Sequence, residues 1–552
     1  MRNRTAQNLL LFIAAVLWLH QHYPLKTANA QGTWNVLLDN AGIASMHTAV
    51  THYGNVIFLD RTNIGPSQIN LTNGVCRDNA IDLTLTHDCS AHSVLFTPGP
   101  NTVRPLFIFT DTWCSSGQFG PDGTLVQTGG DNDGLMKVRR FTPCPSDQSC
   151  DWVEESDNSL QDGRWYASNQ LLPDGRQIVV GGRSVFTLEF IPASGSQKVV
   201  LPFLNQTDDA QNDNYYPFVH LLPDGNLYIF ANRDSIVYNY QTNTVVKTFP
   251  TIPGEPRNYP SAGSSVMLPL QADAENVYGA NVEVLVCGGA QPNCFLYPAP
   301  FPPASQTCGR ISVTGTDAPA WNMEEMPFRR AMGDMVFVAS GDVLIVNGAE
   351  NGCQGWGNAI NPTLSPVMYV PGASEGSRFI TEAPSTIPRV YHSTANLLPD
   401  GRVLIAGSNT HQFYTFTGDF PTELRVEAFS PSYLDSSNDG ERPSIVSAPT
   451  TIVYGQAFTV QVQVTSAAAE FGVSLVSSPF TTHSFSQGLR FLRLRLVGQV
   501  LISGGDSSTS SYSVNVTAPP NSNVAPPAYY MLFVDNQGIP SAAASWVQIT
   551  NS

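Results

Sequence analysis

A chain of 552 residues, 42% of them hydrophobic and 13% charged, can bury a large core, which excludes an intrinsically disordered protein. The length exceeds that of one ordinary domain, and the formal charge of −17 argues against binding to nucleic acid or to an anionic membrane. Frequent turns are expected from 44 glycines and 41 prolines, and short β-branched runs predict an all-β protein.

The first thirty residues have the pattern of a secretory signal peptide. Arg2 and Arg4 precede an apolar run over 9–19, which is short for a membrane-spanning helix, and the small-x-small sequence over 28–30 suits cleavage. We therefore expect residues 1–30 to be removed from a secreted protein, with an uncleaved signal anchor as the less favoured alternative. Cleavage would change the formal charge from −17 to −20, because this segment has three basic and no acidic residues.

Sequons in the mature chain also fit export. They predict N-glycosylation at Asn70, Asn205 and Asn515. No second segment has the length and apolarity of a membrane span.

A phrase of Pro-Asp-Gly, a β-branched run and a closing pair of small residues recurs along the chain. Strong and weak copies together begin at positions 53, 121, 173, 223, 281, 340 and 399. The Asp-Gly pair favours a tight turn, and a repeat of this length with four strands is the kelch signature of a β-propeller. We therefore predict a seven-bladed kelch-type β-propeller over residues 31–434, with six blades as the alternative because the first copy is poor.

The repeat stops after Pro431, and short strand-like runs continue to the end of the chain. Their spacing predicts a second domain, an immunoglobulin-like β-sandwich over residues 435–552.

Reactive side chains stand at similar distances before several repeats. Cys114 precedes the second copy, Tyr166 lies seven residues before the Pro-Asp-Gly of the third copy, and Tyr391 and His392 lie eight and seven residues before that of the last copy. Because equivalent positions of different blades meet around the propeller axis, we expect these side chains to meet. His483 lies between predicted strands of the second domain, from which a hairpin could enter the channel. Two imidazoles and two phenolates form a donor set suited to Cu(II).

The cysteine count is odd, although export to an oxidising compartment favours pairing. Proximity in the sequence suggests the pairs Cys76–Cys89, Cys144–Cys150, Cys287–Cys294 and Cys308–Cys353. Cys114 is then left over, either as a buried free thiol or as a residue with a special role.

The chain resembles the copper-radical oxidases in four segments that lie among or after the kelch repeats. In chain order they are TWCSSG, GRWYAS, RVYHS and TTHSF. The resemblance covers about 35–550 and is closer to glyoxal oxidase than to galactose oxidase. It implies one copper ion held by Tyr166, Tyr391, His392 and His483. It also implies a thioether between Cys114 and Tyr166, a radical on Tyr166, and Tyr391 as the base that takes the substrate proton.

The resemblance further implies the reaction. Small aldehydes, as hydrates, would be oxidised to carboxylic acids while O2 is reduced to H2O2, with peroxidases as consumers of the peroxide and the apoplast or cell wall as the setting in a plant. We expect a monomer that binds neither nucleic acid nor membranes. The alternatives are a primary-alcohol oxidase of the galactose type with the same cofactor, and a non-enzymatic kelch binding protein without copper.

One departure from galactose oxidase concerns the indole that covers the cross-linked tyrosine there. The corresponding stretch here, residues 181–186, contains no tryptophan. Phe186 and Trp165 are the alternatives for shielding the ring of Tyr166. Arg183 is expected either to orient a polar or anionic substrate or to form a salt bridge on the blade surface.

Overall fold

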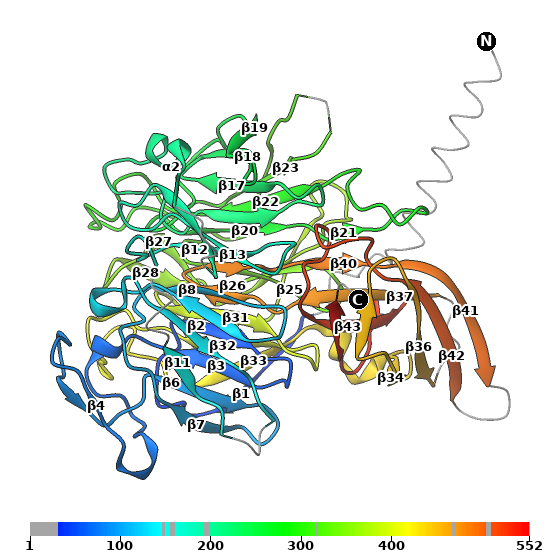
Figure 1. The fold of residues 1–552 in the computed structure, drawn as a ribbon, viewed down its shortest axis with the longest axis horizontal. Coiled ribbons are helices and arrows are strands. Elements are labelled where there is room, and N and C mark those ends of the chain that lie inside the picture. The colour runs from blue at the N-terminus through cyan, green and yellow to red at the C-terminus, as the bar shows by residue number, and fades with distance from the viewer. Residues whose placement is uncertain are drawn as a thin grey trace.

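The computed structural model describes residues 31–145, 149–154, 160–192, 198–315, 318–465, 470–503 and 509–550. The predicted signal peptide, residues 1–30, lies outside the described residues. Strands dominate the described chain, and Figure 1 shows the many short sheets of the N-terminal part beside a smaller C-terminal region that carries β34, β36, β41 and β42.

Seven four-stranded antiparallel units follow one another in the described residues, which confirms the predicted seven blades. The first three contain β2 (His47–Val50), β3 (Val56–Leu59), β6 (Ser93–Thr97) and β7 (Thr102–Leu106); β8 (Ser116–Phe119), β9 (Leu125–Thr128), β10 (Val138–Phe141) and β11 (Trp152–Glu154); and β12 (Ser168–Leu171), β13 (Gln177–Val180), β14 (Thr187–Ile191) and β15 (Val199–Val200). The next three contain β16 (Phe218–Leu221), β17 (Leu227–Ala231), β18 (Asp234–Asn239) and β19 (Thr244–Thr248); β20 (Gly263–Met267), β22 (Glu283–Gly288), β23 (Thr307–Ser312) and β24 (Asn322–Glu325); and β25 (Asp334–Phe337), β26 (Val343–Val346), β29 (Val367–Tyr369) and β30 (Phe379–Thr381).

The seventh blade closes the ring with both ends of the propeller sequence. It contains β31 (Ser393–Leu397), β32 (Val403–Gly407) and β33 (Val426–Ser430), and its outer strand is β1 (Thr33–Leu38) from the beginning of the chain. Antiparallel pairing of β1 with β33 thus joins the first and last segments. The two ends of the propeller sequence are therefore held in one blade, of which β1 is the edge strand.

The C-terminal region contains two sheets packed on each other. One has the order β34–β36–β42–β41, with β34 (Ser444–Ser447), β36 (Ala457–Val464), β41 (Arg495–Ser503) and β42 (Ser510–Thr517). The other contains β35 (Thr451–Val453), β37 (Phe471–Ser477), β40 (Phe491–Arg493), β43 (Tyr529–Asn536), β44 (Ile539–Pro540) and β45 (Ser545–Thr550), and the propeller strand β21 (Leu270–Gln271) joins its edge. Alternate residues of β36, such as Val460 and Val462, are buried, so the sandwich has the period-2 pattern expected of a half-buried strand.

A hairpin from the C-terminal region fills the channel of the propeller. Strands β38 (Phe480–Thr482) and β39 (Phe485–Gln487) pair with each other, and β38 extends the first blade by pairing with β2. The innermost strands β2, β8 and β31 contact β38, and β12, β16, β20 and β25 contact β39. Phe480 and Phe485 are fully buried there, which confirms that a hairpin of the second domain enters the channel.

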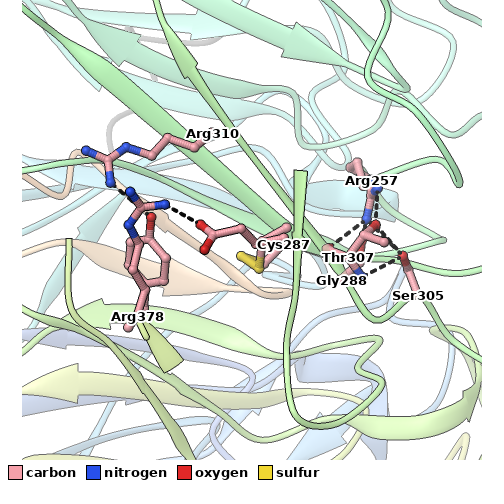
Figure 2. The surroundings of a disulfide bond; sticks show 10 residues. Arg257, Cys287, Gly288, Ser305, Thr307, Arg310 and Arg378 are labelled. Carbon is pink, nitrogen blue, oxygen red and sulfur yellow. Dashed lines mark hydrogen bonds and ion pairs between the residues drawn. A yellow bond between two sulfur atoms is a disulfide. The ribbon is translucent and has the colours of Figure 1, made fainter. Parts of the chain in front are cut away.

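Two of the four disulfides differ from the pairs expected from proximity. Cys76–Cys89 and Cys144–Cys150 form as predicted, whereas Cys287 pairs with Cys308 and Cys294 with Cys353. The expected pairs Cys287–Cys294 and Cys308–Cys353 are therefore wrong. Cys287 on β22 and Cys308 on β23 are direct cross-strand partners, so sheet register and not sequence distance decides the pairing. Figure 2 shows this disulfide among the hydrogen bonds of Arg257, Arg310 and Arg378.

Helices are few and short in the described chain. They are α2 (Pro202–Gln206) and the single 3-10 turns η1 (Thr62–Ile64), η2 (Thr72–Gly74), η3 (Asn132–Gly134), η4 (Ser432–Leu434) and η5 (Ser436–Asn438). Among the residues described, none of these reaches the length and apolarity that a bilayer crossing needs. The side chains of the sequon residues Asn70 and Asn205 are exposed, and Asn515 is half-buried. Two minor hairpins, β4 (Arg77–Asp78) with β5 (His87–Asp88) and β27 (Ala349–Gly352) with β28 (Ala359–Pro362), decorate the blades.

Candidate metal centre

The site residues predicted from the sequence meet where the innermost strands begin. Cys114 precedes β8, Tyr166 precedes β12, and Tyr391 and His392 precede β31. His483 lies in the turn of the hairpin that fills the channel. The backbone N–H of Tyr166 donates to the carbonyl of Cys114 at 3.0 Å, which brings neighbouring blades together at this point.

A left-handed backbone residue stands just before the innermost strand in blades two to seven of the described chain. These residues are Cys114, Tyr166, Tyr216, Ala262, Met332 and His392. The turn residue His483 also has a positive φ of 46°. Positive φ is uncommon outside glycine, costs about 1–3 kcal/mol each and clusters at functional sites. The candidate site residues therefore lie at the end of the channel where the backbone is strained. The strands of each blade position them there.

Three ligand-type atoms of this cluster converge. The Sγ of Cys114, a ring nitrogen of His392 and a ring nitrogen of His483 all lie within 4.8 Å of one another. Cys114 is the one described cysteine outside a disulfide, and it is fully buried. Neither ring nitrogen of His392 has a hydrogen-bond partner in the described structure, although both atoms are buried. A buried imidazole with no partner is costly unless a ligand satisfies it, so the site fits a metal ion.

Burial sets the protonation states of the two imidazoles. Desolvation holds the pKa of His392 well below its usual value, and the neighbouring His483 lowers it further. The pKa of His483 is lowered well below its usual value for the same reason. Both rings are therefore neutral near pH 7, and neutral imidazole is the form that binds copper.

A chain of hydrogen bonds fixes which nitrogen of His483 is unprotonated. His47 Nε2 lies 3.0 Å from the carbonyl oxygen of Thr112, which only accepts, so this nitrogen carries the proton. Burial lowers the pKa of His47 to about 3, so its Nδ1 is unprotonated and accepts from the Thr482 hydroxyl at 2.7 Å. The oxygen of Thr482 then accepts from His483 Nδ1 at 2.6 Å. His483 Nε2 is therefore unprotonated, and in this structure it lies 3.1 Å from the Cys114 Sγ, from whose thiol it can accept. An unprotonated ring nitrogen is what a metal ligand requires.

Three phenols line the same site. The hydroxyl of Tyr259 lies 3.3 Å from that of Tyr166 and 3.0 Å from that of Tyr391. Burial raises the pKa of all three phenols, so each stays protonated at neutral pH unless a cation is close. A metal ion between Tyr166 and Tyr391 would supply that cation and favour both phenolates.

Sequence reasoning missed Tyr216 and Tyr259. Tyr216 stacks on His483 at 4.9 Å between ring centroids, and its hydroxyl donates to the carbonyl of Ser115. It stands seven residues before Pro223, the same offset as Tyr166 before Pro173, so the repeat register could have found it. Tyr259 precedes a copy without Pro-Asp-Gly, so no offset could be counted.

Of the two side chains expected to shield Tyr166, Trp165 is the one that stacks on its ring, and Tyr215 and Tyr259 also stack on it at 5.3 and 4.5 Å between centroids. The rings of Trp165 and Tyr166 stack at 4.8 Å and 21°, whereas Phe186 packs with the apolar core between the third and fourth blades. Arg183 lies over the indole of Trp165 at 4.8 Å, and the structure shows no ion pair of Arg183 among the described residues. Arg183 is thus an exposed cation beside the indole that stacks on Tyr166.

A cavity of about 430 Å³ is lined by turns at the opposite ends of the strands, and none of the candidate site residues lines it. The β2–β3 turn at Gly54 and the β31–β32 turn at Pro399 line it, and no cysteine or histidine is among its lining residues. The titratable cluster, not this cavity, is therefore the candidate site.

Comparison with known proteins covers most of the chain. The family described as glyoxal oxidase N-terminus matches residues 46–433, and the galactose oxidase-like, Early set domain matches residues 442–549. An aldehyde oxidase of Vitis pseudoreticulata is 52% identical over 523 residues, 95% of this chain and 98% of that protein. One of Arabidopsis thaliana is 40% identical over 539 residues, 94% and 85% of the two chains. The solved structure of a fungal alcohol oxidase in complex with copper shares the fold, with a TM-score of 0.70 and 18% identity over 94% of this chain and 99% of that one.

Proposed function

The chain belongs to the glyoxal oxidase family, and from this premise we propose that it is a copper-radical oxidase of small aldehydes. The overall reaction would be RCHO + H2O + O2 → RCOOH + H2O2, with the hydrated aldehyde as the species that reacts. The observation that carries the proposal is the cluster of a free buried cysteine, three phenols and two neutral imidazoles at the axis. Residues 31–434 would form the catalytic propeller, and residues 435–552 would supply His483.

The proposed ligands of one copper ion are Tyr166, Tyr391, His392 and His483. Support comes from the unpartnered ring nitrogens of His392 and from the unprotonated Nε2 of His483, which lies 3.1 Å from the Cys114 Sγ. Cys114 and Tyr166 would be joined by a thioether, which accounts for the one cysteine that has no disulfide partner in the described chain. When bound, copper would accept one electron and the oxidised ring of Tyr166 the other, so no organic cofactor is needed.

The protein groups have separable tasks in this proposal. Tyr391, as a phenolate, would take the hydroxyl proton of the hydrated aldehyde as a general base. Tyr259 carries one proton and can donate it to only one of its two neighbours at a time, so it would hold either the Tyr166 or the Tyr391 oxygen in place. Trp165 would shield the oxidised ring of Tyr166 from solvent by stacking on it.

Secretion as a monomer to the apoplast or cell wall is also proposed, with peroxidases as consumers of the H2O2. The four disulfides and the exposed Asn70 and Asn205 sequons support an oxidising compartment. The plant origin of the two aldehyde oxidases supports the cell-wall setting.

Peptide mass spectrometry of copper-loaded secreted protein tests the proposal directly. We expect the peptides that contain Cys114 and Tyr166 to be joined, with the loss of two hydrogens, and to stay joined after thiol reduction. A Cys114 that is still alkylated after exposure to copper and O2 would refute the radical cofactor. A panel of small aldehydes and primary alcohols then separates the aldehyde reaction from the galactose-type reaction.

A further inference from the structure

Three indoles form a continuous series of ring contacts from Tyr166 to the protein surface. Trp165 stacks on Tyr166 at 4.8 Å, Trp113 meets Trp165 edge-on at 5.0 Å, and Trp356 stacks on Trp113 at 5.5 Å between centroids. Tyr166 is 6% exposed and Trp356 is 38% exposed. The first ring of the series is thus closed to a large molecule in solution, and the last is open to it.

Guanidinium groups lie over every indole of the series. Arg183 covers Trp165 at 4.8 Å, and Arg61 lies 4.6 Å from the ring centroid of Trp113 and 5.2 Å from that of Trp356. Arg61 is 2% exposed, and its Nε and Nη2 atoms have no hydrogen-bond partner in the described structure. A cation over an aromatic face is attracted by the electron-rich ring, so it opposes a positive charge on that ring.

We propose that Trp165, Trp113 and Trp356 conduct single electrons from Tyr166 to a one-electron oxidant that docks at Trp356. The two arginines disfavour an electron vacancy on the indoles and so keep it on Tyr166. This inference rests on the proposed function, in which Tyr166 must be oxidised once before the first turnover. It adds the route by which a buried ring loses that electron.

The step balances without further reactants. With copper bound, Tyr166 would already be a phenolate, so one electron would leave the ring and no bond would form or break. The oxidant gains that electron; with hexachloroiridate(IV) as the probe, the product is hexachloroiridate(III). A peroxidase intermediate would be a physiological oxidant of the same chemical class.

The test follows radical formation and not turnover. Copper-loaded wild type, Trp356→Leu and Trp113→Leu are mixed with hexachloroiridate(IV) in a stopped-flow instrument, and the tyrosyl radical is followed by absorbance and by electron paramagnetic resonance. In both variants we expect formation to slow by at least about tenfold, equivalent to about 1.36 kcal/mol of activation free energy, with an unchanged final amount of radical. Tyr297→Leu, which removes an aromatic side chain that is 72% exposed and outside the series, should match wild type.

Wild-type rates in both tryptophan variants would overturn the route, because the oxidant would then reach Trp165 or Tyr166 directly. A wild type that forms no radical at all would instead refute the proposed function, so the two failures are distinguishable. For the arginines, Arg183→Gln should shorten the lifetime of the radical in the absence of substrate. An unchanged lifetime would show that the guanidinium does not hold the vacancy on Tyr166.

Discussion

The two ends of the innermost strands differ in how much their side chains vary from blade to blade. After these strands, the turns at Gly123, Gly175, Gly225 and Gly401 repeat one left-handed conformation with one residue type. Before them, the repeated left-handed position is held by cysteine, tyrosine, alanine, methionine or histidine. The backbone conformation repeats at both ends of these strands. The residue type varies only at the end before the strand, and it stays glycine in the four turns, named above, that follow the strand. Scaffold and site are therefore separable along a single strand of four or five residues.

The largest expected effect on activity comes from a residue at the positions before the innermost strands, where the residue type varies. Cys114→Ser keeps a small polar side chain at the same left-handed position but cannot form the thioether. We expect the catalytic efficiency for an aldehyde to fall by about 10³-fold or more, equivalent to about 4 kcal/mol of transition-state stabilisation. An oxygen-electrode assay with the copper content measured in parallel checks this. Activity within a few-fold of wild type would mean that the cysteine belongs to the scaffold.

A second substitution tests a residue that hydrogen-bonds to a candidate ligand and is not itself one of the proposed ligands. Thr482→Val keeps the shape of the side chain and removes the hydroxyl that joins His47 to His483. Loss of such a supporting group costs about 10- to 100-fold in metal affinity, so we expect copper binding to weaken by that factor. Titration of the metal-free protein measures the affinity. Thr482→Ser should restore it, because the hydroxyl returns while the methyl group does not.

A buried histidine within an innermost strand predicts that the stability of the folded protein depends on pH. His220 on β16 is buried, and desolvation lowers its pKa from 6.5 to about 3. The unfolded chain therefore binds a proton that the folded protein rejects, so stability is full above pH 6.5 and falls between pH 6.5 and 3 by about 1.4 kcal/mol per pH unit. Denaturant titrations at pH 7 and pH 5 test this. His220→Gln should flatten the dependence by one proton, and an identical slope would contradict the buried neutral state.

The smallest effect is expected for a substitution in the glycine turns that follow the innermost strands. Gly401 has φ of +81°, and its added Cβ would meet Tyr433 at an acceptable 3.4 Å, so Gly401→Ala strains the backbone alone. A left-handed alanine costs about 1–2 kcal/mol. The melting temperature should fall while the catalytic efficiency per folded molecule stays the same. A loss of efficiency would show that the two ends of β31 are coupled.

The repeats made much of this arrangement predictable, because a fixed offset from Pro-Asp-Gly fixes the place of a residue around the axis. Tyr166 and His392 were predicted because each stands seven residues before a Pro-Asp-Gly. Tyr216 has the same offset and could have been predicted in the same way. Contacts without an offset could not be found in this way. Thr482 meets His47 because β38 pairs with β2 across 435 residues, and Cys287 meets Cys308 through sheet register.

The hairpin in the channel also has a consequence for the order of assembly. A chain made from its N-terminus has completed β33, and with it the last blade, before residues 480–487 exist. The ring can thus close around an empty axis, but His483 reaches the other candidate ligands only when the C-terminal region has docked. Contacts of such large sequence separation form slowly. We therefore expect a complete copper site only after the C-terminal region has been synthesised and has docked on the propeller.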